Sequence, residues 1–137
     1  KIANLFNRDG GPTPPVGISV PKAMYDDFVE ICKPIKEINP EYPFEVTVAQ
    51  PRKKPTTMGG TDASVFAVKG VPTYGFREQD FKGYNFNYGE IWHTERDLYT
   101  KSIPEYMEHT SVVTAIVALG VANLKHQLSR EGMYTDQ

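Results

Sequence analysis

His93 is the residue of this sequence whose surroundings best suit chemistry. It lies in the segment Tyr88–Asp97, directly after Trp92, the only tryptophan of the chain. Carboxylates occur three residues before it and two and four residues after it. A neutral imidazole is the commonest metal ligand in proteins, and a nearby carboxylate can fix its tautomer. The segment therefore indicates a metal site or an acid/base site, with a partly exposed loop histidine as the alternative.

Asp9 is a second candidate, because it follows a short apolar segment. The near-continuous apolar order of residues 1–7 predicts a buried strand. Gly10 and Gly11 then let the backbone turn sharply while the carboxylate points away from the strand end. Ligands of α/β proteins gather at the carboxyl ends of strands. Asp9 is thus either a site residue or an aspartate that caps a turn.

Asp62 has a complete structural explanation. Thr61 is placed to be the N-cap of a short helix that continues to Lys69, and Gly70 is a suitable C-terminal stop. Asp62 would lie in the first turn of that helix, where the helix dipole favours a negative charge.

The remaining patterns predict the elements that position these residues. They indicate strands over 16–20, 44–48 and 71–76, and a helix from Ala23 to Ile38 that Pro34 should kink or divide. A long aromatic loop is expected over 77–92. The final helix should start with a capping box at Ser102, continue to about Arg130 and be buried over much of its girth. This order predicts a single α/β domain over residues 1–137, with three layers and a mostly parallel, mixed sheet between helices.

Composition excludes several classes of function. The 137 residues carry a formal net charge of −2, which gives no reason to expect nucleic acid or an anionic membrane as a partner. No apolar run approaches the length of a membrane span. Cys32 is the only cysteine, so the chain can form neither an internal disulfide nor a cysteine-based metal site. The chain begins at Lys1 without an initiator methionine, and we expect it to be part of a longer protein.

Three segments, taken together, resemble the zinc-dependent exopeptidase family of aminopeptidases and glutamate carboxypeptidases. They are Phe6–Asp9, then Gly59–Phe66 with Gly70–Pro72, and Trp92–Thr94 with Asp97. Their order and spacing resemble the C-terminal half of that family's catalytic domain, and the resemblance covers nearly the whole chain.

The resemblance implies a domain with two zinc ions at the carboxyl ends of the strands, bridged by an aspartate. It implies that Asp9 is a carboxylate ligand of one zinc and that His93 is the histidine ligand of the other. Asp62 would support the site without binding metal, and Tyr88 and Trp92 would lie on a substrate-side loop. The substrate would be a peptide with a terminal bond to hydrolyse. Imidazole and carboxylate ligands suit zinc, and a pair of metal ions can polarise a peptide carbonyl and activate water.

The sequence departs from the family pattern in two ways. Ala63 stands where the family's motif has a histidine, and Trp92 stands where some members have a tyrosine. The chain also contains no His-x-Asp and no Glu-Glu. In the family, those upstream segments supply the bridging carboxylate, further ligands and the general base. We therefore expect no catalytic base in this chain, an inactive isolated chain, and the upstream half of the same domain as its partner.

Two other functions fit the same fold. One is a non-catalytic binding or scaffold domain, which the presence of both Asp9 and His93 disfavours. The other is an acyl transferase of the glutaminyl-cyclase type, which uses one zinc. By the same resemblance the parent protein is expected outside the cytoplasm, secreted or periplasmic.

Overall fold

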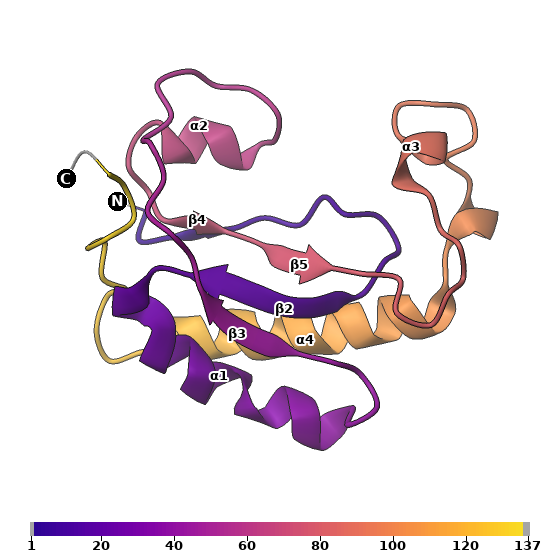
Figure 1. Ribbon diagram of the computed structural model, residues 1–137, viewed down its shortest axis with the longest axis horizontal. Helices are drawn as coiled ribbons and strands as arrows, with labels where there is room; N and C mark the ends of the chain where they lie inside the picture. Colours follow the sequence, from indigo (N-terminus) through magenta and orange to yellow (C-terminus); the bar gives the residue numbers. More distant parts are fainter. Residues whose placement is uncertain (1, 136–137) are drawn as a thin grey trace.

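The computed structural model describes residues 2–135, which fold into a small α/β domain (Figure 1). In chain order the elements are β1 (Leu5–Phe6), β2 (Pro15–Val20), the 3-10 helix η1 (Lys22–Met24), α1 (Tyr25–Ile38), β3 (Glu45–Val48), α2 (Ala63–Ala67), β4 (Thr73–Tyr74), β5 (Phe76–Glu78), α3 (Tyr88–Ile91), the 3-10 helix η2 (Tyr99–Lys101) and α4 (Pro104–Ala122). No helix among the described residues is long and apolar enough to cross a membrane.

The strands form two small sheets with mixed directions. β1 pairs with β4 in parallel, and β2 pairs with β3 in parallel and with β5 antiparallel. The α/β class is therefore as predicted, but hydrogen bonding divides the expected single sheet into two parts.

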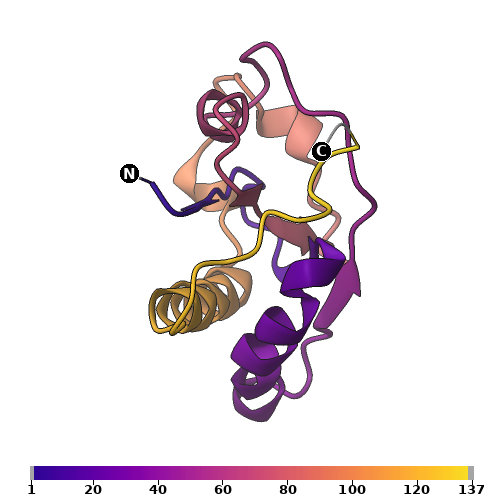
Figure 2. The same cartoon turned by 90° about the vertical axis from the view of Figure 1, so that its left-hand side faces the viewer.

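The helices cover the strands unequally. α1 and α4 pack against each other and against the sheet of β2 and β3, whereas α2 packs on β1 and β4 (Figure 2). The core lies between β2, α1 and α4, and its fully buried members include Ile18, Phe28 and Val113. Four of the six residues of β2 are buried and the other two are half-buried, as expected for the strand that lies between β3 and β5.

The predicted strand over 71–76 is present only in part, as β4 and the first residue of β5, because the chain changes sheets at Gly75. A Cβ atom at Gly75 would lie 2.7 Å from the carbonyl oxygen of Asn7, so the backbone approaches too closely for any side chain. This contact with the segment after β1 separates β4 from β5. The predicted loop over 77–92 likewise contains the end of β5 and all of α3.

Several predicted helix limits are also wrong. α4 ends at Ala122 instead of Arg130, and its N-cap is Ile103, without a capping side chain, instead of Ser102. α1 continues through Pro34 undivided. At α2 the N-cap position belongs to Asp62 and not to Thr61, and no side chain caps it.

α4 is buried on one face and not over much of its girth. Tyr106, His109 and Val113 are buried, whereas Leu119 is 64% exposed. The outward face is apolar but has no covering layer among residues 2–135.

His109 makes the stability of this domain depend on pH. Its side chain is 1% exposed, its ring stacks on that of Tyr42 with 3.9 Å between centroids, and its Nδ1 lies 2.8 Å from the side-chain nitrogen of Asn39. Burial lowers the pKa of His109 below its ordinary value of 6.5, although the backbone of Pro15 opposes the shift. The unfolded chain therefore binds the proton more readily than the folded one.

We expect the free energy of unfolding to be highest above about pH 6.5 and to fall as the pH drops below it, by at most about 1.4 kcal/mol per pH unit from this residue. Urea unfolding between pH 7.5 and 5 measures this slope. His109→Gln should flatten it, whereas His126→Gln, at an exposed position, should not flatten it to the same extent. Equal slopes for the chain and for His109→Gln would contradict the assignment.

Candidate functional site

One cavity gathers the residues singled out in the sequence. It has a volume of about 980 Å³, and its wall includes Asp9, Asp62, Tyr88, Trp92 and His93. These residues come from three segments: the turn after β1, the N-terminus of α2, and the region from α3 to η2. The fold therefore brings together segments that are more than 80 residues apart in the chain.

Asp9 lies in a turn that hydrogen bonds hold firmly. The side-chain nitrogen of Asn7 donates to Asp9 Oδ2 at 3.0 Å. Arg8 Nη2 donates to the carbonyl oxygens of Gly11 and Thr13, at 2.6 and 2.7 Å. The carboxylate of Asp9 is thus presented by a turn that wraps around the guanidinium of Arg8.

Glu78 of β5 contacts two residues of the same turn, Arg8 and Thr13. Its Oε1 lies 3.4 Å from Arg8 Nε, and its Oε2 accepts a hydrogen bond from the Thr13 hydroxyl at 3.3 Å. The two charged side chains are less than 20% exposed. Burial raises the pKa of Glu78, while Arg8 and Thr13 oppose the shift and the charge of Asp9 adds to it. The half-buried pair of Arg8 and Glu78 therefore links β5 to the turn that carries Asp9.

Gly10 leaves the space that Glu78 fills. A Cβ atom at Gly10 would lie 1.3 Å from Glu78 Oε2, although the backbone of Gly10 is not in the left-handed region. We expect Gly10→Ala to displace the carboxylate and to lower the free energy of unfolding by about 1–3 kcal/mol, as overpacking usually does.

A double-mutant cycle with Glu78→Ala, followed by urea unfolding, checks this assignment. Gly10→Ala should cost less in the Glu78→Ala background, because the carboxylate that it displaces is already gone. An equal cost in both backgrounds would show that Gly10 acts through something other than Glu78.

Asp62 lies at the cavity rim, at the N-terminus of α2. Its backbone carbonyl accepts from the amide of Val65 at 3.3 Å, and its side chain makes no capping hydrogen bond. The preceding turn is closed by Ser64, whose Oγ accepts from the amide of Gly59 at 2.9 Å. The carboxylate of Asp62 is consequently not used to cap the helix that it begins.

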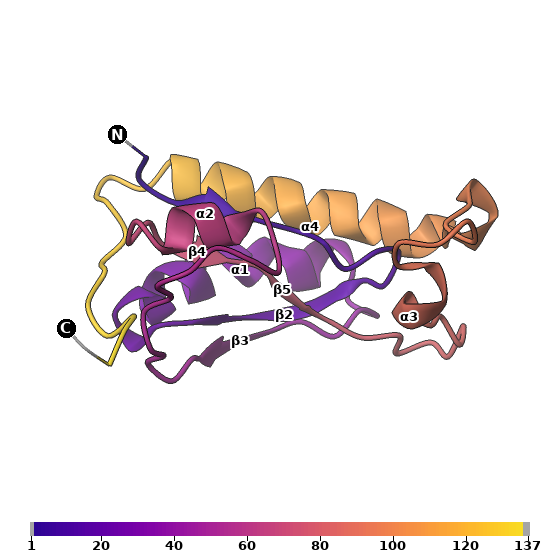
Figure 3. The same ribbon diagram turned by 90° about the horizontal axis from the view of Figure 1, so that it is seen from above.

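His93 lies on a projecting segment, residues 88–102, which we call the arm. The arm stands at the N-terminal end of α4 (Figures 1 and 3). His93 has a left-handed backbone, with φ of 56°, and its ring lies 4.4 Å from that of Trp92, between centroids. A non-glycine residue in this region is uncommon and often marks a functional position.

The arm contributes both aromatic and charged side chains to the cavity wall. Trp92 is 57% exposed and Tyr99 is 92% exposed, so large aromatic surfaces face solvent there. Asp97 and Lys101 add one charge of each sign to the same wall. This surface can accept a ligand with both an apolar part and charged groups.

The donor atoms suit zinc by type but do not complete a site. Asp9, Asp62, Asp97 and His93 offer carboxylate oxygen and imidazole nitrogen, which are zinc ligands. Within the part of the chain that the structure describes, however, no three His, Cys, Asp or Glu side chains are grouped so as to hold one ion. A full set of ligands would need residues from outside this chain.

Several residues of the site carry no local pattern that identifies them in the sequence. Arg8 and Glu78 are 70 residues apart in the chain, and the pairing of β1 with β4 and of β2 with β5 brings them together. Lys101 and Tyr99 lie in an exposed segment without periodicity.

No family model, no curated protein and no solved structure matches this chain.

Proposed function

We propose that this chain is the C-terminal part of the catalytic domain of a zinc-dependent exopeptidase, an aminopeptidase or a carboxypeptidase. One observation carries the proposal: the three motifs that resemble this family contribute Asp9, Asp62 and His93 to the wall of one cavity. Strand ends and helix termini that meet at one place are the usual setting of α/β active sites.

In this proposal each residue has a limited role. Asp9 and His93 are zinc ligands, and the turn built on Arg8 and Glu78 orients the Asp9 carboxylate. Asp62 supports the site through its negative charge. Tyr88 and Trp92 line the side on which a peptide substrate would bind. Zinc in such a site supplies a Lewis acid and an activated water.

The proposal also requires a partner, the upstream half of the same domain. β1 pairs only with β4 among the described strands, so its other edge is open. A cavity of about 310 Å³ beside it is lined by Phe6 of β1, Tyr74 of β4, Val117 and Val121 of α4, and neighbouring residues. An open strand edge next to an apolar helix face is a surface that proteins normally cover. In this proposal the complete domain has three layers, with a mixed sheet between helices. The parent protein lies outside the cytoplasm.

The test uses the full-length protein and chromogenic amino-acid amides and acyl-amino acids as substrates. We expect hydrolysis that requires zinc and is abolished by His93→Ala. It should survive His126→Ala, because His126 is not part of the cavity wall. Peptide binding without hydrolysis would instead indicate a binding domain. Cyclisation of an N-terminal glutaminyl peptide would indicate an acyl transferase.

A further inference from the structure

The arm has little buried surface of its own. From Tyr88 to Lys101 every side chain is exposed except that of Ile91, which is 6% exposed. Local hydrogen bonds shape it, such as those from the Thr94 hydroxyl to the carbonyls of Glu90 and Ile91 at 2.9 and 3.0 Å. Segments with so few buried contacts open at low free-energy cost. Something outside the arm must therefore fix its position.

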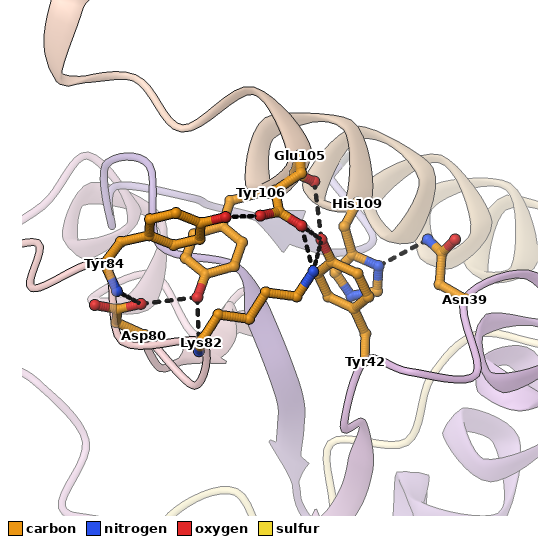
Figure 4. A network of polar contacts seen from close by, with 8 residues as sticks. All are labelled: Asn39, Tyr42, Asp80, Lys82, Tyr84, Glu105, Tyr106 and His109. Carbon is orange, nitrogen blue, oxygen red and sulfur yellow. Dashed lines mark hydrogen bonds and ion pairs between the residues drawn. The ribbon is translucent and has the colours of Figure 1, made fainter.

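Asp80, before the arm, is bonded to the helix that follows it. Asp80 Oδ1 accepts from the hydroxyl of Tyr106 at 2.7 Å and from the amide of Tyr84 at 3.0 Å, and Oδ2 accepts from the amide of Phe86 at 3.3 Å (Figure 4). Tyr106 is fully buried in α4. Its hydroxyl also accepts from the amide of Lys82 at 2.9 Å. The loop before the arm is thus anchored to a rigid core residue.

Glu105, after the arm, is bonded back to the loop before it. Its carboxylate accepts from the Tyr84 hydroxyl, pairs with Lys82 Nζ and accepts from the Tyr42 hydroxyl at 3.1 Å (Figure 4). The rings of Tyr84 and Tyr106 meet edge to face, with 5.2 Å between centroids. Contacts therefore cross the base of the arm in both directions.

We infer that Asp80 and Glu105 form a clasp that closes the base of the arm and so positions His93 relative to Asp9 and Asp62. Both carboxylates join residues before the arm to residues after it, 21 to 26 positions apart in the chain. Hydrogen bonds to an ionised carboxylate are short and directional, which suits a positioning role. The two carboxylates are positioning residues, and neither lines the cavity.

This inference rests on the proposed function only in treating the cavity as the functional site. The positioning role of Asp80 and Glu105 differs from a general contribution to stability, because partly exposed charged pairs contribute little to the free energy of unfolding of a whole domain. Loss of the clasp should free the arm and leave the core unchanged.

The test is amide hydrogen exchange on the 137-residue chain, with Asp80→Asn and with Tyr84→Phe. Tyr84 is 52% exposed, so its substitution should leave the fold intact even if Asp80→Asn does not. We expect the amides of Trp92, Thr94 and Lys101 to exchange roughly 10-fold faster or more, consistent with the loss of a bond to a charged group. The amide of Ala49, which donates to the carbonyl oxygen of the buried residue Val20 at 2.8 Å, should be unchanged.

The fluorescence anisotropy of Trp92 gives an independent readout, because it is the only tryptophan and lies on the arm. It should decrease in both variants and remain unchanged in Glu30→Gln, which removes an exposed carboxylate on α1. Unchanged arm exchange in Tyr84→Phe, or faster exchange throughout the chain in that variant, would overturn the inference. Neither measurement uses zinc or a substrate, so a failure of the proposed function would appear separately, as an absence of zinc-dependent hydrolysis.

Discussion

The 137-residue chain, purified alone and supplied with zinc, should show no hydrolysis of chromogenic amino-acid amides. Two side chains, Asp9 and His93, cannot supply the three or four protein ligands that zinc sites normally have. Among residues 2–135 no group of three potential ligands is assembled. The chain also lacks the Glu-Glu pair that would supply the general base, a role that contributes about 10²–10⁴ in rate.

The measurement is a plate assay with and without zinc, repeated after the upstream half of the domain is added as a separate chain. We expect turnover only in the second case. Turnover by the chain alone that His93→Ala abolishes would mean that the site is complete within these residues and that the upstream assignment is wrong.

Phe28→Ala should have the largest effect on stability, a loss of about 3–5 kcal/mol. Phe28 is fully buried on α1, and its ring meets that of Tyr74 edge to face, with 5.2 Å between centroids. Truncation would remove the contact between α1 and β4 and leave a cavity in the core. Because small domains have a total stability of about 5–15 kcal/mol, the variant should be close to unfolding.

Urea unfolding followed by circular dichroism measures this loss. Leu119→Ala is the matched control, because Leu119 is also a large apolar helix residue but is 64% exposed. It should change the free energy of unfolding by no more than about 0.5 kcal/mol. A loss below about 1 kcal/mol for Phe28→Ala would mean that the α1 packing described above is wrong.

Local patterns predicted most of the elements, because their apolar periodicity reflects burial directly. The strand over Val16–Val20 and the helix that ends at Ile38 are present. The errors arise where tertiary contacts override the pattern. α4 ends early because Leu128, Met133 and Tyr134 turn back and become buried in the core, which an uninterrupted helix would prevent. No glycine or proline follows Ala122 before Gly132.

The candidate site was predictable only in part, for a related reason. Asp9, Asp62 and His93 were found because each belongs to a short motif. Arg8 was not chosen, since its role depends on Glu78, which only strand pairing brings near. The clasp was also missed, because Asp80 and Glu105 act through contacts between segments that no local pattern connects.

The most direct test of the central claim is a zinc titration of the ¹⁵N-labelled chain followed by NMR. The account predicts weak binding in which the amides next to Asp9 and next to His93 shift together, at the same zinc concentration. Asp9→Asn should weaken the shifts around His93, and His93→Ala should weaken those around Asp9. Independent titration of the two regions, or shifts centred instead on His126 and Asp27, a pair 2.9 Å apart on the surface, would contradict the claim that Asp9 and His93 belong to one site.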